Sequence, residues 1–183
     1  MSDLKQAIKQ NYVRCAKEPS YFINQYCTIQ HPQRGKIKFK LYPFQYDVLN
    51  EYQNNDYNVI LKSRQLGIST LSAAYSLWMM LFQNDKNILV IATTKDTAKN
   101  LITKVRVMYD ALPAWLKTAI VENNKLSLTF KNGSQIKAIA SNESAGRSEA
   151  LSLLILDEAA FIDKIDTIWT AAQQTLATGG RCL

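Results

Sequence analysis

The residues best suited to chemistry lie in one short stretch, NVILKSRQLGIST, at residues 58–70. An apolar run is followed by a loop containing Gly67 and then by a helical pattern. A strand, loop and helix in this order direct backbone N–H groups and a helix N-terminus at a ligand, which suits phosphate. In the usual phosphate-loop pattern, G-x-x-x-x-G-K-[ST], Gly67 takes the second glycine and Ser69 the magnesium-binding hydroxyl. The stretch therefore predicts a nucleotide site.

The loop departs from that pattern at two positions. Lys62 stands where the first glycine is usual, and Ile68 stands where the lysine that neutralises the β- and γ-phosphates is usual. Of the two upstream cations, Lys62 has a flexible stem that suits a point contact to phosphate, whereas the planar fork of Arg64 suits a transition state. We expect Lys62 to bind the nucleotide and Arg64 to raise the rate. By itself the loop is equally compatible with an ordinary strand-to-helix turn, in which Lys62 only solvates the strand end.

A second candidate is the pair of acids that ends the aliphatic run 153–156, Asp157 and Glu158. Ligands bind at the carboxyl ends of strands in open α/β sheets. There, a first carboxylate can hold magnesium together with Ser69, and the next can polarise the attacking water. We predict Asp157 and Ser69 as metal-binding and Glu158 as catalytic. The alternative for this run alone is a strand that ends in solvated acids.

A third candidate is Gln45, which follows two aromatic residues, Tyr42 and Phe44. A glutamine amide can accept from and donate to the adenine edge at once, while an aromatic neighbour stacks on the ring. Without the other motifs, Gln45 would be interpreted as an exposed helix residue. The full predicted nucleotide-binding set is Gln45, Lys62, Ser63, Arg64, Gln65, Leu66, Gly67, Ile68, Ser69 and Thr70.

Strands that alternate with helices must position these residues. The chain begins with a weakly patterned arm over 1–30, and a period-two row with lysines at 36, 38 and 40 predicts a half-buried strand. The remaining predicted elements are a helix from Pro43, a buried strand over 57–61, a helix with an apolar face over 71–82, a strand over 86–94, a helix capped by Thr94 or Asp96, a hairpin over 125–140 that turns at Asn132-Gly133, a strand that begins at 151, a helix over about 162–176 and a strand opening at 181. This alternation predicts an α/β fold with a mostly parallel sheet.

Composition narrows the function. A length of 183 residues suits one α/β domain, and a net charge of +7 favours a polyanionic partner such as nucleic acid. One histidine and three cysteines without a C-x-x-C pair exclude a histidine-rich metal site and disfavour zinc and a disulfide framework. Apolar runs are too short to cross a bilayer, and the N-terminus lacks a signal peptide. The lysine row at 36–40 suits either DNA phosphates or a solvated strand edge.

An ordered set of segments resembles a known family. SRQLG in the loop, LPAWL, the hairpin KNGSQIKAIAS, AGRS and LILDEAAFI together resemble the N-terminal ATPase domain of the large terminase subunit of tailed bacteriophages, from about Leu41 to Leu183. The resemblance implies an additional-strand P-loop ATPase fold with a β-hairpin insertion. It divides the chain into an arm and basic strand over 1–40 and an ATPase core over 41–183. We expect this core to end before the coupling motif and the nuclease domain.

The resemblance also implies an activity and partners. These are ATP and Mg²⁺, hydrolysis that translocates double-stranded DNA into a procapsid, a portal protein, a small terminase subunit and a homo-oligomeric ring. The location implied is the host cell cytoplasm and, transiently, the procapsid, without a membrane. Arg64 matches an arginine thought to act within the subunit, and Arg147, in AGRS, matches one thought to reach a neighbour's ATP.

Two rival functions stay open. The first is a helicase-like ATPase that depends on nucleic acid. The second is a degenerate nucleotide- or DNA-binding module without hydrolysis, which is suggested by Ile68 in place of the usual lysine. The presence of both Asp157 and Glu158 argues against the second, because a site that does not hydrolyse ATP does not need the catalytic acid.

Overall fold

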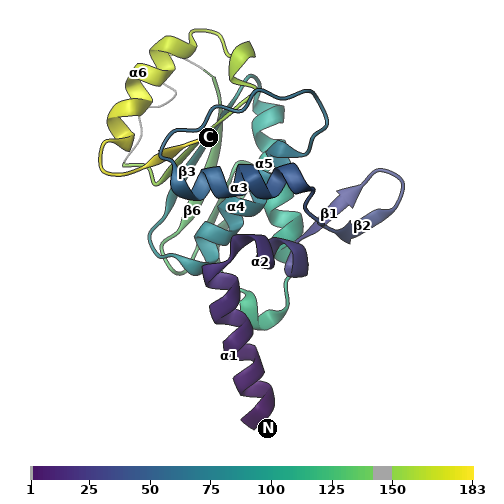
Figure 1. Ribbon diagram of the computed structural model, residues 1–183. Coiled ribbons are helices and arrows are strands. Elements are labelled where there is room, and N and C mark those ends of the chain that lie inside the picture. The colour runs from purple at the N-terminus through teal and green to yellow at the C-terminus, as the bar shows by residue number, and fades with distance from the viewer. Residues whose placement is uncertain (1, 142–149) are drawn as a thin grey trace.

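The computed structural model describes residues 2–141 and 150–183 (Figure 1). A six-stranded sheet with the order β4-β5-β6-β3-β7-β8 forms its centre. Its strands are β3 (Asn87–Ala92), β4 (Ile120–Asn123), β5 (Ser127–Phe130), β6 (Gln135–Ala140), β7 (Leu153–Asp157) and β8 (Arg181–Cys182). The pairs from β6 through β3 and β7 to β8 are parallel, while β5 pairs antiparallel with β4 and β6. The expected α/β fold with a mostly parallel sheet and a β-hairpin is confirmed.

Helices cover both faces of this sheet. They are α3 (Pro43–Asn54), α4 (Ile68–Phe82), α5 (Lys95–Asp110) and α6 (Ile165–Leu176), with 3₁₀ turns η1 (Ala114–Leu116) and η2 (Ala159–Phe161). Because side chains alternate along a strand, Ile88 and Val90 of β3 pack into the core that includes α4 and α5, while Leu89 and Ile91 pack into the core formed with α6. Figure 1 accordingly shows α6 apart from α3, α4 and α5. The sheet is thus the middle of three layers.

The N-terminal residues contribute more structure than the sequence pattern predicted. Where an arm was expected, the chain forms α1 (Ser2–Lys17), which projects from the body, and α2 (Pro19–Tyr26) (Figure 1). Phe22 and Ile23 of α2 are fully buried in the main core. Trp78 of α4 donates from its indole nitrogen to the carbonyl of Cys15 at 2.8 Å. Polar residues between these few apolar positions hid the helical pattern.

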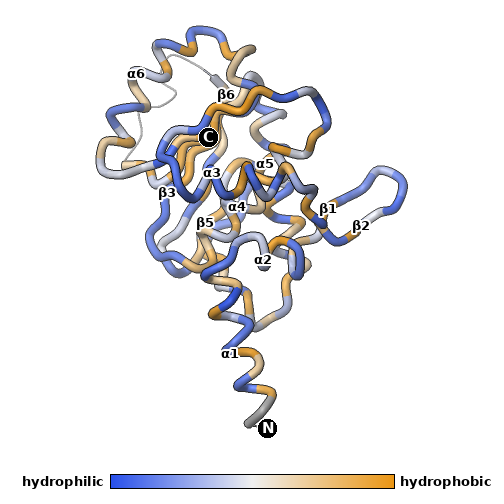
Figure 2. Tube along the Cα trace, in the orientation of Figure 1, coloured by the Kyte–Doolittle hydropathy of each residue, from blue (hydrophilic) through white to orange (hydrophobic). Residues whose placement is uncertain are grey.

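The basic row lies at a two-stranded hairpin, β1 (Thr28–His31) and β2 (Gly35–Lys38), which projects from the body with a hydrophilic tip (Figures 1 and 2). The predicted strand is therefore shorter, ending at Lys38. The Nζ atoms of Lys38 and Lys40 donate to the carbonyls of Gln25 and Asn24 at 2.9 and 3.2 Å. These carbonyls end α2, where a cation is favourable. Two of the three lysines thus stabilise a helix end, and Lys36 is exposed.

The predicted buried strand over 57–61 is wrong. Tyr57 makes a single parallel bridge with Cys182, and the side chains of Val59 and Leu61 are 99% and 102% exposed. Beyond this bridge, the Asn58 amide donates to the Cys182 carbonyl at 3.0 Å, and residues 59–61 have no backbone partner among the described residues. A strand needs a partner to satisfy its backbone groups, and the described residues contact this segment only at Tyr57 and Asn58.

The other expected strands and helices are confirmed within a few residues. Thr94 caps α5, since its hydroxyl accepts from the Thr97 amide at 3.2 Å. At the β5–β6 turn, Gly133 alone of the predicted pair has a positive φ, of 80°. The side-chain Nδ2 of Asn132 instead donates to the carbonyls of Met80 and Gln83, and these hydrogen bonds connect the turn to the end of α4. None of the helices in the described part of the chain is long and apolar enough to span a membrane.

Candidate nucleotide site

The loop between residues 62 and 67 leads directly into the N-terminus of α4. Gly67 is the N-cap of this helix with φ at 73°, and Gln65 also has a positive φ, of 65°. A left-handed conformation is easy for glycine but costly for glutamine, and such strain is concentrated at functional sites. The loop therefore makes two sharp turns just before a 15-residue helix, whose first N–H groups are unsatisfied within the helix. This geometry is suited to binding phosphate.

Ser69 and Asp157 come together although they are 88 positions apart in the chain. The Ser69 hydroxyl, in the first turn of α4, donates to Oδ1 of Asp157, the last residue of β7, at 2.8 Å. A hydroxyl and a carboxylate are the hard oxygen ligands that Mg²⁺ prefers. Among the described residues, no group of three or more histidine, cysteine or acidic side chains could hold a metal. This donor set fits magnesium, which is usually held by one or two carboxylates together with phosphates and water.

Glu158 follows Asp157 in an unusual backbone conformation. Its φ and ψ are 57° and 44°, in the left-handed region, and its carbonyl accepts from the Phe161 amide at 2.9 Å to begin η2. The residue is exposed. The chain thus turns sharply at the end of β7, and the second acid departs from the strand direction that Asp157 still follows. The predicted catalytic acid therefore stands at the same sheet edge as the Ser69–Asp157 contact.

Gln45 is buried, with 1% of its surface exposed, and its amide joins two elements. Oε1 accepts from the Tyr42 amide at 3.1 Å, and Nε2 donates to the Leu66 carbonyl at 3.0 Å. A Cβ on Gly67 would stand 2.9 Å from this Nε2, so the helix start and the loop are in close contact. Gln45 thus fastens the start of α3 to the loop, a role that the adenine hypothesis did not include. Its contact with adenine stays a prediction.

Two aromatic rings lie beside this contact in the sequence. Tyr42 and Phe44 stack with centroids 5.9 Å apart and planes 7° apart, and their side chains are 63% and 37% exposed. Exposed, nearly parallel rings can take part in stacking with a planar base. The predicted aromatic neighbour of Gln45 is therefore available at the surface.

The cations of the loop are accessible. Arg64 is exposed and Lys62 half-buried, and the structure records no hydrogen bond from either side chain to another described residue. Ser63, Gln65 and Leu66 are also exposed, Thr70 is half-buried, and Ile68 is buried with 8% exposure. Ile68 therefore packs against the core and cannot take the place of the missing lysine. Arg147 lies outside the described residues.

Sequence analysis missed a third cation, Lys104 of α5. Burial lowers the pKa of its ammonium, while the nearby negative charge of Asp157 raises it and the positive charge of Lys62 lowers it further. Lys104 is thus within electrostatic reach of both the metal-binding candidate and the loop lysine. In the sequence, the buried Ile102 and Val105 on either side of Lys104 indicate that it lies on a helix. They do not indicate that it approaches Lys62, which is 42 residues earlier in the chain.

Comparison with known proteins identifies a family and similar folds. The model of the family described as "Terminase large subunit, T4likevirus-type, N-terminal" matches residues 59–181. The large terminase of bacteriophage HK97 is similar over 92% of this chain, with 22% identity and a TM-score of 0.70. The large terminase ATPase domain of Thermus phage P74-26 is similar over 79%, with 21% identity and a TM-score of 0.62.

A third similar structure is the large terminase of a thermophilic bacteriophage in complex with ATP-γ-S. It is similar over 76% of this chain, with 18% identity and a TM-score of 0.57. At these identities the structures show a shared fold. The chain spans 36% of the HK97 protein, 36% of the thermophilic phage protein and 64% of the P74-26 domain.

Proposed function

The chain belongs to the family of N-terminal regions of T4-type terminase large subunits, and from this premise we propose that it is an ATPase motor domain that drives double-stranded DNA into a viral procapsid. Its ligand in this proposal is ATP with Mg²⁺. The observation that carries the proposal is the contact of Ser69 with Asp157 at the N-terminus of α4. It joins the hydroxyl of a phosphate loop to the carboxylate at the end of a parallel strand, the two groups that hold Mg²⁺ in nucleotide hydrolases with such a loop.

Each residue has a defined task in this proposal. The amides of the loop and of the first turn of α4 bind phosphate oxygens, and Lys62 and Arg64 add the positive charge that Ile68 cannot supply. Ser69 and Asp157 would hold Mg²⁺, which supplies charge neutralisation at the phosphates. Glu158 accepts the proton of the attacking water. The similar thermophilic phage terminase with ATP-γ-S bound supports this choice of ligand.

The partners are also part of the proposal. Double-stranded DNA, a portal protein and a small terminase subunit would meet a homo-oligomeric ring of this chain on the procapsid, in the host cytoplasm. The net charge of +7 supports an acidic partner such as DNA. Because Lys38 and Lys40 are bound to α2, the exposed Arg34 and Lys36 of the β1–β2 hairpin are the better candidates there for phosphate contacts. Arg147 would serve a neighbouring subunit's ATP.

Phosphate release from Mg-ATP tests this function against both rivals. The measurement uses the chain alone and with double-stranded or single-stranded DNA. The proposal expects hydrolysis that double-stranded DNA stimulates more than single-stranded DNA. Stimulation by single strands alone would favour the helicase-like ATPase. Tight binding of ATP-γ-S with no hydrolysis under any of these conditions would favour the module without catalysis. This alternative is suggested by Ile68, which stands where the phosphate-binding lysine is usual.

A further inference from the structure

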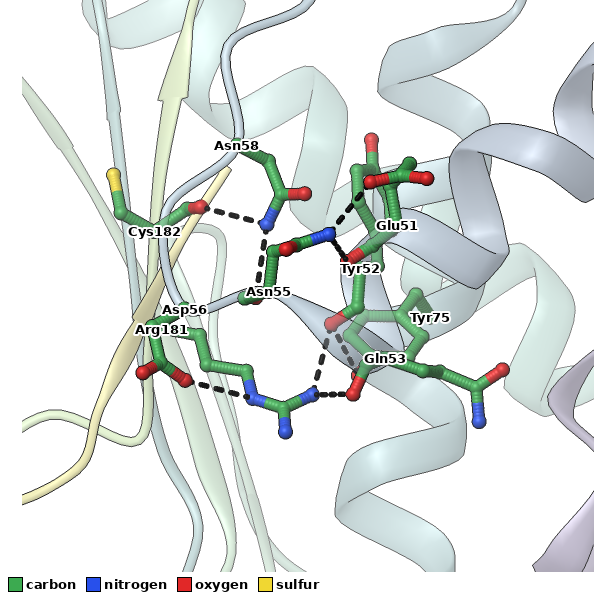
Figure 3. A network of polar contacts seen from close by, with 9 residues as sticks. All are labelled: Glu51, Tyr52, Gln53, Asn55, Asp56, Asn58, Tyr75, Arg181 and Cys182. Atoms are coloured by element: carbon green, nitrogen blue, oxygen red, sulfur yellow. Dashed lines mark hydrogen bonds and ion pairs between the residues drawn. The ribbon is translucent and has the colours of Figure 1, made fainter.

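The C-terminal end of α3 is held by a residue outside the nucleotide site, Arg181 of β8. Its Nη1 donates to the carbonyls of Tyr52 and Gln53 at 2.9 and 2.8 Å (Figure 3). Carbonyls in the last turn of a helix have no partner within the helix, and a cation is favourable there. Arg181 therefore satisfies two backbone groups that α3 cannot satisfy by itself.

This contact depends on the carbonyls rather than on an ion pair. Nε of Arg181 lies 3.9 Å from Oδ1 of Asp56, whose side chain is 71% exposed, and exposed pairs of this kind contribute little. The Tyr75 hydroxyl donates to the same Tyr52 carbonyl at 3.4 Å. Backbone hydrogen bonds extend the junction, since the Cys182 amide donates to Asp56 at 2.7 Å and the Asn58 amide donates to Cys182 at 3.0 Å. The start of β8 is thus bound firmly to the end of α3.

The other end of α3 is bound to the loop. Gln45, in the first turn, donates to the Leu66 carbonyl, so the 12-residue helix has one end at the loop and one at β8. Toward its C-terminal end, the Tyr52 hydroxyl and the Ser72 hydroxyl are 3.0 Å apart, which joins α3 to α4. Burial raises the pKa of Tyr52 to about 12, so this hydroxyl stays protonated.

The connection closes through the sheet. Arg181 pairs with Leu153 at the start of β7, and β7 ends at Asp157, which accepts from Ser69 beside the loop. The loop, α3, β8 and β7 therefore form one closed series of contacts. If ligand binding displaces the Leu66 carbonyl, these contacts carry the displacement to α3 through Gln45 and from α3 to β8 through Arg181.

We propose that Arg181 is a positioning residue that couples nucleotide binding at the loop to the backbone of β8, with α3 as the connecting element. The proposal rests on the proposed function, since its ligand is the nucleotide. Coupling between two sites is reciprocal, so β8 also influences the affinity of the loop for nucleotide. Arg181 touches neither ligand nor reacting atoms and acts only through α3.

Hydrogen exchange at individual backbone amides tests the coupling in the 183-residue chain. Protection is measured with and without saturating ATP-γ-S and Mg²⁺, at the loop amides and at the amides of Asn58 and Cys182. In the parent we expect nucleotide to slow exchange at both places, by about fivefold or more at Asn58 and Cys182. In Arg181→Gln the loop should still respond, whereas the response at Asn58 and Cys182 should fall to about twofold or less.

Matched variants separate coupling from local stability. Asp56→Asn removes the charge pair but leaves the carbonyl contacts, and it should respond to nucleotide as the parent does. Gln45→Met breaks the connection at its other end and, at an ATP-γ-S concentration shown by titration to saturate this variant, should also remove the response at Asn58 and Cys182, with the Arg181 contacts intact. This second variant carries the test if Arg181→Gln does not fold.

The outcomes distinguish the two proposals. A parent in which nucleotide protects the loop but not Asn58 or Cys182 overturns the coupling and leaves the ATPase function standing. A parent in which nucleotide protects neither place overturns both. If Arg181→Gln and Gln45→Met exchange faster at β8 yet keep the full nucleotide response, Arg181 is only structural and the coupling is wrong.

Discussion

At the scale of residues, the site divides its work among side chains that the sequence brings from three places. Ser69 and Asp157, the proposed metal-binding pair, are in contact, whereas Glu158, the proposed catalytic acid, is one residue further on in a left-handed conformation. In the proposal, Lys62 and Arg64 supply the positive charge that position 68 lacks, and Lys104 lies within electrostatic reach of Lys62 and Asp157. Each of these tasks can be removed singly by mutation.

Glu158→Gln should leave ATP-γ-S affinity nearly unchanged and lower turnover by about a hundredfold or more. Glutamine keeps the shape of the side chain but cannot accept a proton, and a positioned general base contributes about 10²–10⁴ in rate. Phosphate release is measured on a form of the protein that turns over ATP, with the exposed Asp163→Asn as the control. Turnover near that of the parent would remove Glu158 from the mechanism.

Lys62→Ala should weaken ATP-γ-S binding about tenfold or more, and Arg64→Ala should mainly lower the turnover number. The ammonium of Lys62 makes a ground-state contact to phosphate, whereas the fork of Arg64 suits the transition state. Titration with ATP-γ-S and steady-state turnover measure the two effects. Parent-like binding by Lys62→Ala together with no binding by Arg64→Ala would reverse the assignment.

Lys104→Met should raise thermal stability at pH 7 and weaken nucleotide affinity. Burial lowers the pKa of Lys104, so its charged form destabilises the fold below that pKa, and the penalty is relieved as the pH rises from the folded pKa toward 10.5. The parent should therefore gain stability relative to Lys104→Met as the pH increases through that range. Melting temperatures at pH 7 and above, with the exposed Lys131→Met as control, measure this. A parent that melts above Lys104→Met at pH 7 would contradict the sign.

At the scale of elements, local pattern succeeded where an element finds its partners within the described chain. The alternation of apolar residues in β3 and β7 predicted buried strands, and both strands have partners on each side. Residues 57–61 have a similar apolar pattern, but among the described residues only Tyr57 and Asn58 contact another strand, and no strand forms. Pairing is a property of two segments, which a single pattern does not contain.

The N-terminal helices show the opposite error, because α1 and α2 form where the sequence pattern predicted only a weakly patterned arm. Phe22→Ala should lower the free energy of unfolding by about 3–5 kcal/mol, because it removes a fully buried ring from the main core. Val13→Ala on the exposed part of α1 should change it by less than about 0.5 kcal/mol. Urea unfolding measures both. Equal, small effects would mean that α2 is not part of the core.

At the scale of the whole molecule, the sequence predicted the order of the motifs and the class of fold, since hydrophobic strands and the acids that follow them are local signals. It also predicted that Ser69 and Asp157 lie in one site, and the structure brings them into contact, whereas the ligand that they would share stays a prediction. It did not predict that Gln45 is a buried connection to the loop or that Lys104 approaches Asp157. Those contacts are set by helix packing between segments far apart in the chain.

The central claim, a magnesium nucleotide held by Ser69 and Asp157, is tested most directly by titrating the chain with ATP-γ-S with and without Mg²⁺, for the parent and for Asp157→Asn. The account predicts that Mg²⁺ tightens binding to the parent about tenfold or more and that the variant loses most of this effect. Ser69→Ala should lose part of it. Equal affinity with and without Mg²⁺ in the parent, or an undiminished Mg²⁺ effect in Asp157→Asn, would contradict the account.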